Sequence, residues 1–162
     1  MKPSNFLVRG VLALVGVGSK MQSVQMQLTA DEVKDDMEHF EPYGITSNPH
    51  PGAEGLTAFI NGDRSDGVVL CISDRRFRLQ ALKTGEVALY TDEGDFLHFK
   101  RGREIAIETL TLSVKAATGV NFDTPLIRTT GRIEATGDVV AAGVSTSQHV
   151  HEGSDKKPVP GG

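Results

Sequence analysis

Residues 112–144 constrain the fold most, because they are mainly Thr, Val, Ala, Gly and Ile in short pieces separated by glycines. Residues 129–139 illustrate the pattern, with apolar and polar side chains alternating as in a β-strand that has one buried face. Each piece buries little apolar area, and at about 25 cal/mol per Å² this does not offset an ordering entropy of about 1–2 kcal/mol per residue. One chain alone therefore cannot close a core from these strands, whereas three chains wound together can.

The rest of the composition agrees with a chain that is rich in turns and small side chains. The sequence has 18 Gly, 7 Pro, no Trp and 6% aromatic residues, which favours repetitive all-β structure over a helical bundle. Its 162 residues suit one compact domain followed by an extended region. A net charge of -4 provides no long-range attraction to phosphate backbones or anionic lipids, so nucleic acid is not an expected partner.

The first 80 residues have the strand pattern of a small barrel. The apolar run of residues 11–17 is too short for a membrane span and lacks a convincing cleavage site, so it is interpreted as part of a strand rather than a secretion signal. Period-2 alternation and turn residues predict four strands, over residues 6–15, 21–28, 56–60 and 68–73. About five short strands with a loop-rich middle therefore predict a barrel.

Three further features of this region carry predictions. Residues 28–37 are dense in Asp and Glu and are expected to form either a short helix capped by Thr29 or an exposed loop. Residues 42–55 contain three prolines and three glycines, which predicts a long ordered loop. The single cysteine, Cys71, stands in an apolar run and is expected to be buried.

A second strand-rich region comes next. Residues 87–90 and 96–99 flank an acidic turn at residues 92–95 and predict a hairpin, because the turn is too short and wrongly spaced for a calcium loop. Alternation then continues through Ile105 and Ile107 and changes phase at Thr109. The basic cluster at residues 75–78 lies beside Asp74 and is expected to be paired with acidic groups on the surface or to face a docking partner.

Near the end of the chain, His149 and His151 are two residues apart. In a strand, side chains at this spacing face the same side. Two imidazoles are too few to close a metal site, but three copies on a threefold axis supply six neutral ring nitrogens. That donor set fits a six-coordinate first-row ion such as iron and not tetrahedral zinc. A pair of surface histidines without metal is the alternative.

Several segments taken together resemble the Mu-type baseplate assembly protein V family, the central spikes of contractile-tailed phages and phage-tail-like bacteriocins. The resemblance extends from about residue 20 to residue 153. The segments that carry it are residues 38–47 (EHFEPYGITS), 51–54 (PGAE), 62–64 (GDR), 74–76 (DRR), 85–95 (GEVALYTDEGD) and 149–151 (HVH). Residues 48–50 (NPH) depart from the expected Val-Pro-Leu pattern, and His50 is not assigned to a metal site.

The resemblance implies an all-β protein with three parts: an OB-fold collar over residues 1–80, an intertwined homotrimeric triple-stranded β-helix over 81–145, and a conical apex with a C-terminal tail over 146–162. It further implies an iron ion at the apex, held by His149 and His151 of three chains, with calcium and chloride as further candidates on the trimer axis. The implied function is that of a structural spike that docks to the baseplate hub and other baseplate components and pierces the host outer membrane during contraction. Such a protein is assembled in the host cytoplasm and resides in the virion tail baseplate.

Two other classes of function remain as alternatives. An OB-fold module that binds nucleic acid would need a basic groove with exposed aromatic side chains, and one that binds protein would need a docking face. A metallohydrolase using His149 and His151 would need a third ligand, an open coordination position and a general base. The sequence has no recognisable Ser/His/Asp arrangement or paired carboxylates, so no catalytic residue is predicted and the chain is not expected to be an enzyme.

Overall fold

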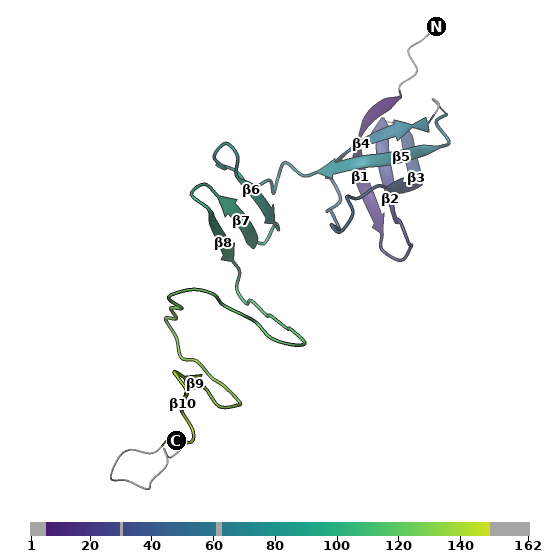
Figure 1. The fold of residues 1–162 in the computed structure, drawn as a ribbon. Coiled ribbons are helices and arrows are strands. Elements are labelled where there is room, and N and C mark those ends of the chain that lie inside the picture. Colours follow the sequence, from purple (N-terminus) through teal and green to yellow (C-terminus); the bar gives the residue numbers. More distant parts are fainter. Residues whose placement is uncertain (1–5, 30, 61–62, 150–162) are drawn as a thin grey trace. The chain divides into compact units, whose positions relative to one another are not determined.

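The computed structural model describes residues 6–29, 31–60 and 63–149, and the regular structure in these ranges consists of β-strands (Figure 1). The chain divides into two compact units, Met1–Ser113 and Val114–Gly162. The prediction of an all-β protein is therefore confirmed for the described ranges. No helix in them is long and apolar enough to span a membrane.

The first unit begins with a closed five-stranded barrel. Its strands are β1 (Leu7–Gly16), β2 (Gln22–Thr29), β3 (Glu32–His39), β4 (Glu54–Phe59) and β5 (Gly67–Ser73). They follow the order β1-β2-β3-β5-β4, and the pairing of β1 with β4 closes the barrel. The β3–β5 pair is parallel and the other pairs are antiparallel. This mixed five-stranded closure is the arrangement of an OB-like barrel, and the four predicted strands lie within two residues of observed ones.

The prediction of a helix or loop over residues 28–37 is wrong, because most of this segment forms β3. Pairing with β2, such as Val24 with Met37 and Gln27 with Val33, determines its conformation. Asp36 has a positive φ of 53° at an irregularity in this pairing. The backbone N–H of Asp36 donates a hydrogen bond to Oδ1 of Asp35. The acidic side chains that suggested a loop thus lie at a break in a strand, and tertiary pairing outweighs local propensity.

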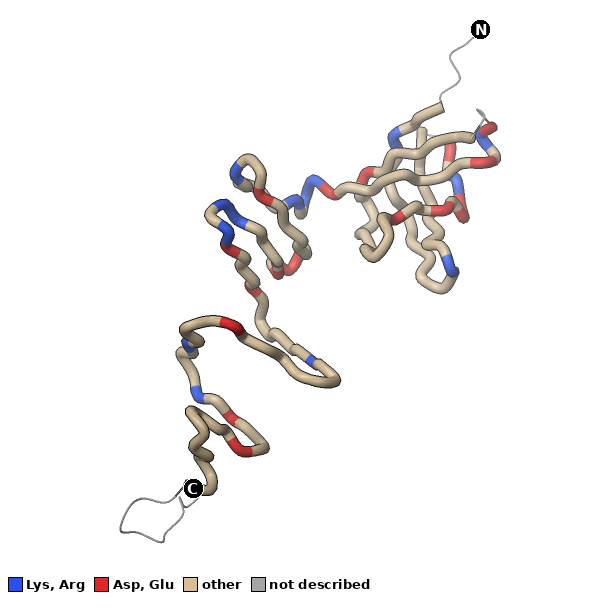
Figure 2. The backbone as a smooth tube through the Cα atoms, in the orientation of Figure 1, with Lys and Arg blue, Asp and Glu red and all other residues tan. Residues whose placement is uncertain are grey.

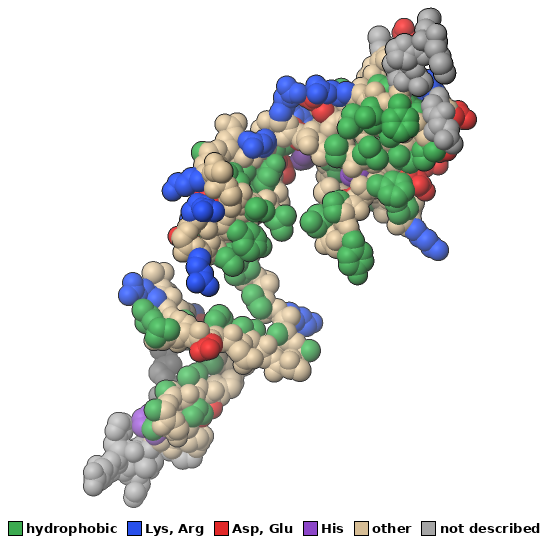
Figure 3. Space-filling view, turned by 45° about the horizontal axis from the view of Figure 1, so that its top comes forward, with side chains coloured by type: hydrophobic (Ala, Val, Ile, Leu, Met, Phe, Trp, Pro, Cys, Tyr) green, Lys and Arg blue, Asp and Glu red, His purple; other side chains and the backbone are tan. Residues whose placement is uncertain are grey.

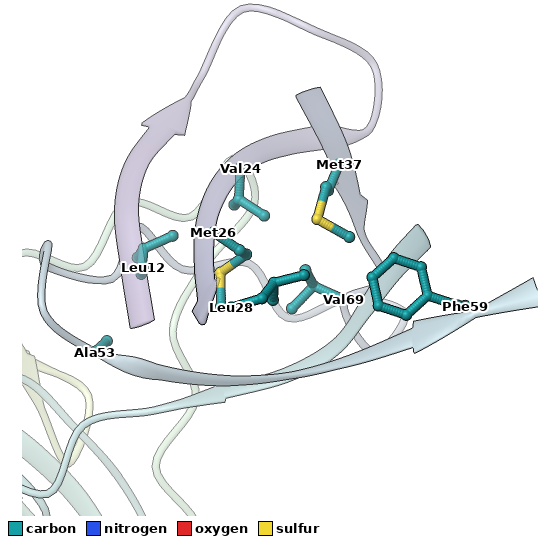
Figure 4. Close-up of a cluster of buried hydrophobic side chains, with 8 residues drawn as sticks. All are labelled: Leu12, Val24, Met26, Leu28, Met37, Ala53, Phe59 and Val69. Atoms are coloured by element: carbon teal, nitrogen blue, oxygen red, sulfur yellow. The ribbon is translucent and has the colours of Figure 1, made fainter. Parts of the chain in front are cut away.

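The barrel encloses the hydrophobic core, in which side chains from all five strands point toward one another (Figure 4). Its buried members are Leu12, Val24, Met26, Leu28, Met37, Ala53, Phe59 and Val69. Gly10 is required where β1 passes close to β2, because a Cβ at this position would lie 2.9 Å from the Gln27 carbonyl oxygen. The close spacing of the strands therefore depends on a residue without a side chain.

Cys71 is exposed, which makes the prediction of a buried cysteine wrong. The cause is a shift of register between β4 and β5, in which Leu56 pairs with Cys71 while the next residue, Thr57, pairs with Val69. Leu70 is the extra residue of this bulge and is exposed as well. A bulge shifts the inward and outward alternation by one residue, so an unbroken apolar run does not reveal which side chains are buried.

A three-stranded antiparallel sheet comes after the barrel within the first unit. Its strands are β6 (Val87–Tyr90), β7 (Phe96–Lys100) and β8 (Glu104–Glu108), in the order β6-β7-β8. The predicted hairpin is confirmed, and Gly94 supplies a φ of 93° in its turn. The register places six apolar side chains on one face: Val87, Leu89, Leu97, Phe99, Ile105 and Ile107. All of them except Leu97 are exposed, and Figure 3 shows hydrophobic side chains at the surface of this part of the chain.

The second unit contains little regular structure in its described part. Residues 114–139 form no strand and are all exposed. Strands β9 (Val140–Ala141) and β10 (Val144–Ser145) then pair as a very short hairpin. The exposed apolar residues in this stretch include Val120, Phe122, Leu126, Ile127 and Ile133. The strands predicted between residues 112 and 139 are therefore not seen in the single chain, and the triple-stranded β-helix stays a prediction.

A buried hydroxyl in the barrel gives a test of this packing. The Oγ1 of Thr57 is buried without a hydrogen-bond partner, and the residue is 0% exposed. Thr57→Val keeps the shape and removes the desolvation cost of the hydroxyl, so we expect a gain of about 1 kcal/mol in unfolding free energy. Chemical denaturation measures it, with Thr57→Ser as the control that keeps the hydroxyl, removes the methyl group and should be less stable than the wild type. If Thr57→Val is less stable than wild type, the Thr57 hydroxyl is not an unsatisfied buried group.

Candidate metal centre

His149 lies at the end of the described part of the second unit, four residues after Ser145. Its backbone N–H and its ring Nδ1 both bond to the Ser145 carbonyl oxygen, at 3.2 and 2.8 Å. A carbonyl oxygen only accepts hydrogen bonds, so Nδ1 carries the proton and donates it. In the neutral ring the lone pair is then on Nε2, the form in which histidine coordinates a metal ion through that nitrogen. The donor chemistry of His149 therefore fits the predicted iron site.

A carboxylate holds the turn that precedes His149. The Oδ1 of Asp138 accepts hydrogen bonds from the Thr146 hydroxyl at 3.2 Å, and from the backbone N–H and hydroxyl of Ser147 at 3.1 and 2.9 Å. Bonds from the hydroxyls of Ser145 and Ser147, with further bonds from the Ser147 N–H and the Thr146 hydroxyl, lower the pKa of Asp138 to about 2. Asp138 is thus ionised at neutral pH, and its contacts span the short hairpin. Nothing in the sequence marks Asp138 for this role, because its partners are eight and nine residues away.

The other predicted members of the apex are only partly visible. His151 lies outside the described residues, so it stays a prediction that the side chains of His149 and His151 point to the same side. The residues described for this single chain contain no group of three or more His, Cys, Asp or Glu side chains arranged for a metal ion.

The remaining histidines have partners elsewhere. The Nδ1 of His39 lies 2.7 Å from the Gln22 side-chain oxygen, and burial lowers the pKa of this imidazole. His50 pairs with Asp92, with Nε2 and Oδ2 3.0 Å apart, and its ring packs against Phe77. The His50 ring is thus engaged with side chains of the first unit.

His98 belongs to a clamp in the three-stranded sheet. Its Nε2 lies 3.1 Å from Oε2 of Glu86, a carboxylate that also accepts bonds from the backbone N–H groups of Lys83 and Arg101, at 2.9 and 3.0 Å. These two backbone bonds, with a contribution from His98, lower the pKa of Glu86 to about 2. Glu86 therefore fastens two loops to the sheet. A glutamate just before a strand gives no sequence signal of this role, because its partners are up to 15 residues away.

Two arginines of the basic cluster after β5 are paired with acidic groups, as predicted for the cluster. Arg76 bonds to Asp74 and to the Pro51 carbonyl oxygen, and Arg75 bonds to Glu54. Figure 2 shows Lys and Arg interspersed with Asp and Glu along the backbone.

Comparisons with known proteins agree with this arrangement. A family model described as Bacteriophage Mu Gp45, N-terminal, matches residues 9–76, which include most of the barrel. The baseplate puncturing device gp45 of Escherichia phage Mu is 30% identical over 164 residues, covering 91% of this chain and 83% of that protein. The chain belongs to the phage Mu gp45 family. The Mu-like prophage FluMu protein gp45 of Haemophilus influenzae is 33% identical, over 94% of this chain and 89% of its own length.

Membership of the gp45 family decides between the classes of function. As a member of this family, the chain is a structural spike protein of the virion tail baseplate and not an enzyme. The metallohydrolase interpretation of His149 and His151 is therefore rejected, and so is that of a free-standing nucleic-acid-binding module. Both the barrel and the histidines are to be understood as parts of a puncturing device.

The Glu86 clamp predicts a pH dependence of stability. Because the pKa of Glu86 is about 2 in the folded protein and 4.5 ordinarily, its stabilising contribution is complete above about pH 4.5 and is lost as the pH falls toward 2. We expect Glu86→Gln to have a lower thermal midpoint than wild type at pH 7 and the gap to narrow between pH 4.5 and 2. Glu93→Gln, in the β6–β7 turn, is the control and should match wild type throughout. If the difference in thermal midpoint between Glu86→Gln and wild type is the same at pH 7 and pH 2, ionised Glu86 does not act as a clamp.

Proposed function

We propose that three copies of this chain form the spike at the centre of a contractile tail baseplate, and that this spike pierces the host outer membrane when the tail contracts. Membership of the gp45 family supports this function, since the phage Mu relative is a baseplate puncturing device. The observation that most directly supports a trimer is the exposed apolar face of the β6-β7-β8 sheet.

That face is too apolar to remain in water. Its exposed members Val87, Ile105 and Ile107 are 55–60% accessible in the single chain. At about 25 cal/mol per Å², covering such a face is strongly favourable, and a contiguous apolar patch on a soluble protein ordinarily marks an interface. Three copies arranged around an axis would cover one another's faces. The outer strands β6 and β8 also have one unpaired edge each within their sheet, and neighbouring chains would pair with these edges.

The proposed needle comprises residues 81–145. Exposed apolar side chains recur between residues 114 and 139, although no strand forms there in a single chain. In an intertwined triple-stranded β-helix, backbone groups would pair between chains and these side chains would face the axis. A rod in which every strand edge is paired has no loose loop to buckle, which is what a device under axial load requires.

In the proposed spike, the collar and the apex would lie at the two ends of the needle. Residues 1–80 would dock to the baseplate hub and to other baseplate components through the outer surface of the barrel, whose strands are all paired. Residues 146–162 would form the tip, with His149 and His151 of three chains holding one iron ion. Bound iron would tie together three chain ends that would otherwise fray. Calcium and chloride on the axis belong to the same proposal, without protein ligands assigned.

The first test is the mass and metal content of one purified sample. We expect light scattering to give three times 17.4 kDa, and metal analysis to give about one iron per three chains. His149→Ala combined with His151→Ala is the matched variant. It should lose the iron and keep the trimeric mass, because the needle supplies most of the interface. A metal-free monomer would overturn the proposal. Dissociation of the double variant into monomers would show that the needle does not supply most of the interface.

The second test concerns the apolar sheet face. Leu89 belongs to that face, and the adjacent Tyr90 lies on the opposite one. Their exposures are similar, at 53% and 43%, so Leu89→Lys and Tyr90→Lys form a matched pair. We expect Leu89→Lys to weaken trimer formation, because it would bury three ammonium groups near the axis, and Tyr90→Lys to leave the mass unchanged. Light scattering over a dilution series measures this, and trimers of equal strength in both variants would exclude this face as the interface.

A further inference from the structure

We propose that Asp138 is the positioning residue of the apex: it locks the turn whose Ser145 carbonyl accepts a hydrogen bond from the Nδ1–H of His149, so that this histidine coordinates metal through Nε2. The inference rests on the proposed function of the chain end as an iron-holding tip. Asp138 itself does not ligate the metal. It acts through Ser147, Gln148 and the Ser145 carbonyl.

The hairpin that carries this arrangement is too short to be stable by its ladder alone. Strands β9 and β10 have two residues each, and the turn residues Ala142 and Gly143 both have positive φ, at 49° and 79°. One further backbone bond, from the Thr146 N–H to the Val139 carbonyl at 2.9 Å, extends the pairing. Isolated two-stranded hairpins are marginal even at greater length, so side-chain contacts must supply the remaining order.

Asp138 supplies that order from a position two residues before β9. Its Oδ1 receives three donors from Thr146 and Ser147, the two residues just after β10. The carboxylate therefore bridges the open end of the hairpin and fixes the direction in which the chain leaves it. Hydrogen bonds to an ionised carboxylate are about twice as strong as those between neutral groups, which suits a small, exposed element.

The next contacts continue the path to His149. The Ser145 hydroxyl accepts a bond from the Gln148 N–H at 2.9 Å, and the Ser145 carbonyl then accepts from both the N–H and the Nδ1 of His149. One serine thus holds the backbone and the ring of the histidine together. Without the Asp138 bridge, residues 146–148 could leave this path, and the ring would lose its acceptor.

The carbonyl acceptor has a chemical consequence for the metal. A neutral imidazole has one N–H and one lone pair, so a proton held on Nδ1 leaves Nε2 as the donor nitrogen. An N–H that donates to a carbonyl also makes the opposite nitrogen a better ligand, and losing such a partner typically weakens metal binding by about 10- to 100-fold. Asp138 would therefore tune both the orientation and the affinity of a ligand that it does not touch.

The test compares iron retention in full-length wild type, Asp138→Ala and Asp123→Ala. Asp123 is an exposed carboxylate of the same unit that makes none of these contacts, which makes it the matched control. With iron as the probe and a competing chelator, we expect Asp138→Ala to release iron at a chelator concentration at least about 10-fold lower than wild type, and Asp123→Ala to match wild type. Light scattering checks that each variant keeps its mass, and Asp138→Asn, which retains one acceptor oxygen, replaces the alanine variant if that one does not assemble.

A second readout reports the ring directly. Long-range proton–nitrogen NMR of metal-free, histidine-labelled protein distinguishes the two neutral tautomers. We expect the Nδ1–H form at His149 in wild type and a loss of that preference in Asp138→Ala. If wild type binds iron, and Asp138→Ala shows the same iron retention and the same His149 tautomer as wild type, the role of Asp138 is overturned while the iron site at the apex is retained. Wild type without iron would overturn the apex itself.

Discussion

The structure depends on one constraint: in the described ranges, only the barrel buries an apolar core within a single chain. All the buried hydrophobic side chains belong to residues 12–69, and Phe59, Met26 and Val69 are fully enclosed there. Beyond the barrel, the apolar side chains of β6, β7 and β8 share one face that nothing in the described part of the chain covers. The barrel thus has an apolar core of its own in the single chain, whereas the described residues after it leave their apolar side chains exposed.

Where apolar burial is missing, carboxylates that accept backbone and hydroxyl hydrogen bonds take over the local ordering. Glu86 holds two loops to the three-stranded sheet, and Asp138 closes the hairpin before His149. Asp74 does the same at the end of β5, where it bonds to the backbone and side chain of Arg76. Hydrogen bonding lowers the pKa of all three groups. Each remains charged at neutral pH, so these hydrogen bonds order the turns within the single chain.

Much of the barrel could be predicted from the sequence, because period-2 alternation and turn residues mark β1, β2, β4 and β5 directly. The sequence failed where non-local pairing decides. The acidic residues of β3 suggest a loop until β2 is seen to pair with them, and the bulge that exposes Cys71 shifts alternation by one residue without changing the composition. The pair His149 and His151 was visible as a motif because its members are close together in the sequence. Asp138 was not, because its role depends on a turn that returns the chain nine residues later.

The position of the Asp138 turn gives a reason why the proposed metal would bind at the same end of the chain as this hydrogen-bonded clamp. Residues 114–139 are exposed, and the hairpin after them is too short to order the next residues by packing. In the proposed trimer, a metal ion could bind three chain ends only if each presented its histidine nitrogen in a compatible orientation. A turn that fixes the tautomer of His149 in the single chain reduces the ordering cost at the moment of binding, since less conformational freedom remains to be lost. The clamp and the metal would therefore act in sequence: hydrogen bonds within one chain prepare the ligand, and the ion then joins the three chains.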